Sequence, residues 1–155
     1  MRTSVALCAL AIAFAVPAFS QEPPHFHTVT AKSLKWTDTP LIAGGQGKVT
    51  VIEGPLDKAA PFTLRILFPA NSSIAPHFHS AIEHVTVISG TFNVGHGENF
   101  DKKKTKALGR GDVAIMQPKT PHFGWVDKET IVQVHGVGPW TVTFVNPADD
   151  PRKKK

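Results

Sequence analysis

The stretch Pro76-His77-Phe78-His79-Ser80-Ala81-Ile82-Glu83 decides how this chain is interpreted. Residues two apart on an extended chain point to the same side, so we expect the imidazoles of His77 and His79 on one face. Glu83 follows after a short turn and opens a run of strand-forming residues that ends at Ser89. The stretch therefore predicts two histidines and a carboxylate that lie close together.

Alternation along the run from Glu83 indicates where its side chains point. Glu83 shares a face with Val85 and Val87, and His84 lies on the opposite face. If the valines face the core, the carboxylate is buried with them, which is unfavourable unless a partner compensates its charge. A divalent cation is a suitable partner, because imidazoles and carboxylates bind it and it neutralises the buried charge.

A second segment supplies a fourth group. Gly111-Asp112 forms a turn into a short apolar run, Val113 to Met116, and a further turn over 117–121 leads to His122. We therefore predict one divalent transition metal held by His77, His79, Glu83 and His122. Such a set leaves one or two coordination positions for water or substrate, as in catalytic metal sites.

These two segments resemble the paired motifs of the cupin superfamily. His77-x-His79, Glu83 and Gly90 match the first motif in type and spacing, and Gly111-Asp112 with His122 matches the second. The chain departs from the usual motifs at four positions, where Asn71, Gln117, Lys119 and Val126 stand in place of Gly, Pro, Gly and Asn. The departures affect turn positions, whereas all four ligand positions are filled.

The resemblance implies an all-β fold, the double-stranded β-helix or jelly-roll barrel, in a single domain. It also implies a metal in the barrel, with manganese, iron or zinc as the first expectations and nickel or cobalt also open. It does not select a reaction, because this fold carries oxygenases, isomerases, decarboxylases, lyases and binding proteins.

The rest of the chain agrees with an all-β architecture. Short runs rich in Val, Ile, Phe and Thr end at Gly, Pro or Asn, and no window shows a helical period. The predicted strands are Lys48 to Glu53, Phe62 to Phe68, Glu83 to Ser89, Thr91 to Val94, Val113 to Met116, Ile131 to His135 and Trp140 to Val145. We assign 21–40 to an extended N-terminal arm, 41–147 to the barrel and 148–155 to a basic tail.

Residues 1–20 have the pattern of a secretory signal peptide: a basic start at Arg2, an apolar run, and small residues at Ala18 and Ser20. We therefore expect a periplasmic or secreted protein that is free of the membrane after cleavage. The only cysteine, Cys8, would leave with the signal, so thiolate ligands and disulfides are excluded from the mature chain. The net charge of +5 comes without a basic face interleaved with aromatics, and nucleic-acid binding is not expected.

Four further residues are candidates for lining a substrate pocket: Arg65, Gln133, His135 and Trp125. The first three are polar positions on predicted strands, which face either water or a polar pocket, and Trp125 follows His122 closely enough to cover the site. Trp140 is interpreted as a packing residue.

We expect a metal-dependent enzyme that acts on a small organic molecule. With iron the chemistry would resemble that of cupin dioxygenases, and with zinc or manganese it would be isomerisation or decarboxylation. A non-catalytic module that binds a metal or a small ligand in the periplasm is the alternative. A homodimer that pairs through sheet edges is a further expectation.

Overall fold

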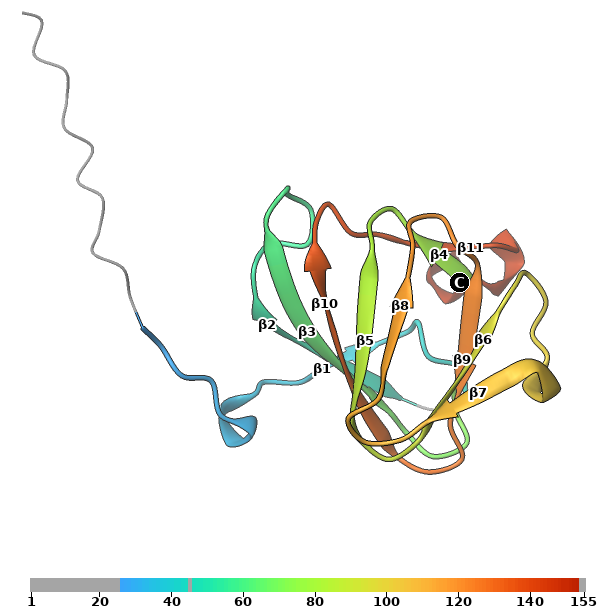
Figure 1. Ribbon diagram of the computed structural model, residues 1–155, viewed down its shortest axis with the longest axis horizontal. Coiled ribbons are helices and arrows are strands. Elements are labelled where there is room, and N and C mark those ends of the chain that lie inside the picture. The colour runs from blue at the N-terminus through green and yellow to red at the C-terminus, as the bar shows by residue number, and fades with distance from the viewer. Residues whose placement is uncertain (1–25, 45, 154–155) are drawn as a thin grey trace, which may run out of the picture.

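The computed structural model describes residues 26–44 and 46–153, which form a single all-β domain (Figure 1). No α-helix occurs among these residues, and none of their helical segments is long and apolar enough to cross a membrane. The strands are β1 Thr37–Thr39, β2 Gly47–Glu53, β3 Pro61–Phe68, β4 Ser73–His79, β5 Glu83–Ser89, β6 Phe92–His96, β7 Thr105–Leu108, β8 Val113–Met116, β9 His122–Trp125, β10 Thr130–Val137 and β11 Val142–Phe144. Short 3-10 turns span Ala31–Ser33, Lys102–Lys104, Pro147–Asp149 and Pro151–Lys153.

Two antiparallel sheets face each other across the core. The larger sheet has the order β1-β2-β3-β10-β5-β8, and the smaller has the order β11-β4-β9-β6-β7. Strands that are neighbours in space are often distant in sequence, as where β10 lies between β3 and β5. This is the jelly-roll arrangement, so the expected fold is confirmed.

The core between the sheets follows the period-two pattern of the strands. Val85 and Val87 of β5 and Val132 and Val134 of β10 are buried, and the residues between them are more exposed. Aromatic side chains from both sheets fill the remaining space, including Phe62, Phe68, Phe92, Phe123 and Phe144. Glu83 is buried on the same face as Val85, as its alternation predicts.

Each of the predicted strand runs overlaps an observed strand, but β1, β4, β7 and β9 were not predicted as strands. β4 contains Pro76, which cannot donate a ladder hydrogen bond, and the middle of β7 is Lys106-Ala107, a pair with low strand propensity. The predicted signal peptide lies outside the described residues. The last residues of the predicted arm form β1, which pairs with β2 and so belongs to the larger sheet.

Two of the departures from the cupin motifs have a structural explanation. Asn71 (φ +60°) and Lys119 (φ +61°) are the residues other than glycine with positive φ in the described part of the chain. They stand where the motifs have glycine, so the turns keep the left-handed conformation although the residue type has changed. The Lys119 amide donates to the His79 carbonyl at 2.8 Å, which holds the turn before His122 against the end of β4.

Candidate metal centre

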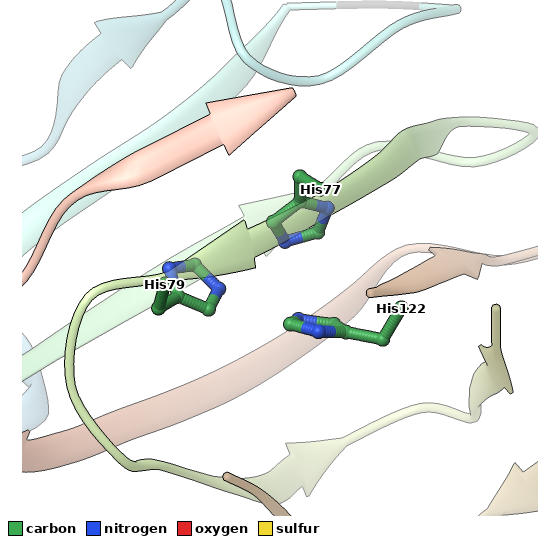
Figure 2. A group of neighbouring side chains, drawn as sticks. All are labelled: His77, His79 and His122. Atoms are coloured by element: carbon green, nitrogen blue, oxygen red, sulfur yellow. The ribbon is translucent and has the colours of Figure 1, made fainter. Parts of the chain in front are cut away.

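Four side chains that the sequence singled out meet in the interior of the barrel. His77 and His79 come from β4, Glu83 begins β5 and His122 begins β9. Each is buried, with 2–5% of its surface exposed: His77 4%, His79 2%, Glu83 4% and His122 5%. Figure 2 shows the three imidazoles turned toward one another, and their ligand atoms lie within 4.8 Å of each other.

Backbone carbonyls determine which ring nitrogen carries the hydrogen in all three imidazoles. The Nδ1 atoms of His77, His79 and His122 lie 2.8, 2.9 and 2.9 Å from the carbonyl oxygens of Ala75, Thr141 and Thr120. A carbonyl only accepts, so each Nδ1 carries the hydrogen and a neutral ring then has its lone pair on Nε2. Histidines that ligate metals are typically oriented by such bonds from the nitrogen that does not bind the metal.

Glu83 lies against these lone pairs. Its Oε2 atom is 3.1 Å from Nε2 of His79 and 3.3 Å from Nε2 of His122. With Nδ1 protonated, a neutral ring has no hydrogen to place between Nε2 and the carboxylate, so the facing atoms repel each other. A cation among these atoms, whether a metal ion or a proton on an imidazole, removes the repulsion.

The electrostatics of the cluster favour neutral His77 and ionised Glu83. Burial, followed by the proximity of His122 and His79, lowers the pKa of His77 to about 3. Burial alone would raise the pKa of Glu83, but hydrogen bonds from His122 and His79, which need a proton on Nε2, outweigh it and bring that pKa down to about 2 in the absence of a metal. At neutral pH the site therefore presents an imidazole lone pair and a carboxylate, the forms in which these groups bind metals.

The residues present fit a divalent transition metal. Three imidazole nitrogens and a carboxylate suit manganese, iron, cobalt, nickel and zinc. Nε2 of His79 is buried and makes no hydrogen bond, as expected of an atom that serves as a metal ligand. The donor set alone does not select among these metals.

An apolar cavity of about 190 Å³ lies beside the cluster. It borders His77, His79 and Glu83, and its other walls are Thr39, Leu41, Ile42, Val49, Leu56, Leu64, Ile66, Ile74, Trp140 and Val142. Trp140 stacks on the ring of His79, with centroids 4.6 Å apart and an interplanar angle of 11°. Trp140 was interpreted as a packing residue, so its place in this wall was missed by sequence reasoning.

The four residues predicted to line the substrate pocket lie elsewhere. Gln133 and His135 alternate with the buried Val132 and Val134, so they are on the outer face of the larger sheet, where Nε of Arg65 donates to Oε1 of Gln133 at 3.1 Å. Trp125 makes a cation–π contact with Lys102, whose Nζ atom lies over the indole ring at 4.2 Å from its centroid. None of the four borders the cavity beside the cluster.

The misplacement has a simple physical reason. Alternation shows which residues of a strand share a face, but it does not show which face is inside. Polar residues on strands were interpreted as candidates for a polar pocket, whereas the observed cavity is apolar and its polar atoms belong to the metal centre. The apolar walls come from segments that carry no motif, such as Leu41, Ile42 and Leu56.

Solved structures share this architecture. The polyketide cyclase RemF from Streptomyces resistomycificus matches with a TM-score of 0.66 at 18% identity, over 82% of this chain and 90% of that one. An acetylacetone dioxygenase from Acinetobacter johnsonii matches with a TM-score of 0.62 at 13% identity, over 88% of each chain. An RmlC-like cupin from Shewanella frigidimarina matches with a TM-score of 0.56 at 18% identity, over 72% of this chain and 89% of that one. No family model and no curated protein sequence matches this chain.

Proposed function

We propose that this chain, which has the fold of the cupins, is a metal-dependent enzyme that acts on a small, largely apolar organic molecule. The observation that carries the proposal is the apolar cavity of about 190 Å³ that opens onto His77, His79 and Glu83. A metal held by these residues and His122 would supply a Lewis acid for an oxygen atom of the substrate. A cavity beside an incomplete coordination shell is typical of catalytic rather than structural metal sites.

The cavity walls indicate the kind of substrate. Apart from Glu83 and the two histidines, the lining residues are hydrophobic side chains and Thr39, so no lysine or arginine is available to pair with a carboxylate or phosphate. An anionic group that lies away from the metal would be buried without a cationic partner, which is strongly unfavourable. The volume is also below the usual range of about 300–1,000 Å³ for pockets that take drug-sized ligands. We infer a small compound that is apolar over most of its surface and whose polar atoms are grouped at the end that faces the metal.

The chain's own residues would bind and orient such a compound. Thr39, Leu41 and Val142 come from segments near both ends of the domain and form part of the wall beside the cluster. Trp140 packs between Phe62 and His79, so it holds the His79 ring in position while forming part of the cavity wall. The apolar walls lower the effective dielectric constant around the centre, which strengthens electrostatic interactions there.

Within this class, the finer proposal is a dioxygenase that acts on enolisable carbonyl compounds. One of the structures that share the fold is named an acetylacetone dioxygenase. In a dioxygenase reaction O2 oxidises the substrate and both its atoms enter the products, so no separate reductant or organic cofactor is required. Isomerisation or decarboxylation with zinc or manganese is the non-redox form of the same proposal.

The test uses the chain from residue 21, loaded separately with Mn(II), Fe(II), Co(II), Ni(II) or Zn(II). Each form is incubated with β-diketones and other small enolisable ketones while substrate absorbance and O2 consumption are followed. We expect turnover above that of the free ion with at least one metal, and its loss in His122→Gln. His84→Gln, altered on the outer face of the sheet, should retain it. Stoichiometric metal binding with no turnover of any compound would favour the binding-module alternative.

We also propose that the protein is exported, on the strength of the signal-like pattern in residues 1–20. N-terminal sequencing of the protein from the periplasm or medium of a bacterial host should begin at Gln21. A chain recovered only from the cytoplasm with residue 1 intact would contradict it.

A further inference from the structure

A second, smaller cavity borders the metal centre from inside the core. Its volume is about 30 Å³, and it is lined by Ile66, Phe68, Ile74, His77, Glu83, Val85, Phe92, Met116, His122, Phe123, Val132 and Val134. Most of these side chains are almost completely buried, among them Phe68, Val132 and Val134 at 1–2% exposure. The cavity thus lies within the core, and it adjoins the larger cavity, with which it shares the walls Ile66, Ile74, His77 and Glu83.

The two cavities approach the cluster differently. Both border His77 and Glu83, but the smaller one borders His122 and not His79, whereas the larger one borders His79 and not His122. A metal at the centre of the cluster would therefore face the smaller cavity on the side of His122 and the larger one on the side of His79. Two different reactants could reach it without competing for the same volume.

The size and walls of the small cavity limit what it can hold. A volume of about 30 Å³ exceeds the ~10–15 Å³ needed for one very small molecule, yet it is too small for an organic substrate. A stable buried water needs two to four polar partners. The polar groups that border this cavity belong to the metal centre, so they would be bound to the metal and would not be free to hold a water. Small apolar cavities stay dry and take up apolar gases, and O2 is an apolar diatomic molecule.

A surface depression adjoins this cavity on the side of Met116 and His122. The depression has a volume of about 200 Å³ and is lined by Val94, Gly95, His96, Ala114, Ile115, Met116, Thr120 and His122. Met116 and His122 border both the depression and the small cavity, so they separate the two. The methionine side chain is unbranched and has several rotatable bonds, which makes it the more adaptable part of this partition.

From this arrangement we propose that the small cavity is a docking site for O2, which reaches it past Met116, while the organic substrate occupies the larger cavity beside His79. This rests on the proposed function in its dioxygenase form and adds to it where the oxidant is held. The observation that carries it is a small, mostly apolar cavity that borders His122, whereas the larger cavity borders His79.

The test measures O2 in the cavity directly and needs no turnover. Dissolved O2 is paramagnetic and accelerates the relaxation of nearby methyl groups, so methyl NMR spectra are recorded under O2 and under argon with the full mature chain and Zn(II). We expect the methyls of Val85, Val132 and Val134 to show enhancements several-fold larger than those of Val87 and Val126. These two valines are equally buried but border neither cavity.

A matched pair of variants separates the two cavities. Val132→Ile adds a methylene toward the small cavity and should abolish the excess relaxation at Val85 and Val134, and Val142→Ile adds one at the larger cavity and should leave it intact. Equal enhancement at all buried methyls, or an ordered water in the small cavity in a crystal structure, would overturn the proposal. The measurement works even if no substrate is turned over, so its failure is distinct from failure of the proposed function.

Discussion

Nε2 of His122 lies 3.3 Å from Oε2 of Glu83, although His122 begins a strand of the smaller sheet and Glu83 begins a strand of the larger one. The contact joins the two sheets in the interior of the barrel. A metal bound at this point would tie β4 and β9 on one side to β5 on the other. Metal binding and the stability of the domain are therefore coupled.

Metal should raise the stability of the protein, and this should depend on His122. At a free Zn(II) concentration about 100 times its dissociation constant, the free energy of unfolding is expected to rise by about 2.7 kcal/mol. Thermal unfolding followed by circular dichroism, with Zn(II) and with chelator, measures the difference. His122→Gln should show no such increase, and His84→Gln should show it in full. An identical increase in all three proteins would place the ion elsewhere.

The metal-free protein should lose stability as the pH falls below about 6.5. The pKa of His77 is lowered from 6.5 to about 3 in the folded state, so between these values the unfolded chain binds a proton that the folded chain does not. The free energy of unfolding should then fall by about 1.4 kcal/mol per pH unit for this one group. Glu83, with its pKa lowered from 4.5 to about 2, adds a loss of the same sign below pH 4.5.

Urea unfolding of the chelated protein at a series of pH values between about 8 and 4 checks this dependence. His77→Gln is the control, because it removes the first titrating group and should flatten the curve between about pH 6.5 and 4.5. A wild-type stability that is constant across this range would show that His77 titrates alike in the folded and unfolded chains.

Replacing Lys119 by glycine should stabilise the domain. Lys119 has φ +61°, and a left-handed conformation costs a residue with a Cβ atom about 1–2 kcal/mol. Glycine avoids that cost but loses about 0.5–1 kcal/mol through its greater freedom in the unfolded chain, so the expected net gain is about 0.5–1 kcal/mol. The amide that bonds to the His79 carbonyl is kept. Lys106→Gly, on exposed strand β7, should instead destabilise the protein in the same chemical denaturation experiment.

The ring of Trp140 and its indole N–H should contribute unequally to the stability of the protein. Its ring packs on Phe62 and His79, but its indole N–H is buried with no hydrogen-bond partner in the described part of the chain. Trp140→Phe removes the unpaired donor and should cost about 1 kcal/mol or less. Trp140→Ala should cost about 3 kcal/mol because it leaves a void beside the cluster. Comparable losses in both variants, measured by chemical denaturation, would mean that the N–H makes a stabilising contact.

Much of the site follows from local sequence. His77 and His79 are two apart on an extended segment, and Glu83 shares a face with Val85, so both spacing and alternation bring them into the interior. His122 could be assigned to the site only through the second cupin motif, because its approach to Glu83 depends on the pairing of distant strands. The glycine pattern was informative even where glycine was absent, since Asn71 and Lys119 keep the positive φ of the turns.

The cavities could not be predicted in this way. Their walls consist of hydrophobic side chains from many strands, and nothing in Leu41, Val49 or Val132 distinguishes a cavity wall from ordinary core. Polar strand residues were predicted from the sequence to line a pocket, yet Gln133 and His135 lie on the outer face of the larger sheet. Such volumes depend on how all strands pack together, which period-two patterns do not encode.

The most direct test is a crystal structure of the protein loaded with Fe(II), Mn(II) or Zn(II), with diffraction recorded on both sides of the absorption edge of the metal. The account predicts one anomalous peak per chain, at about 2.0–2.2 Å from Nε2 of His77, His79 and His122 and from a carboxylate oxygen of Glu83. A fully loaded crystal with its peak elsewhere, or with the three imidazoles turned away from the ion, would contradict it.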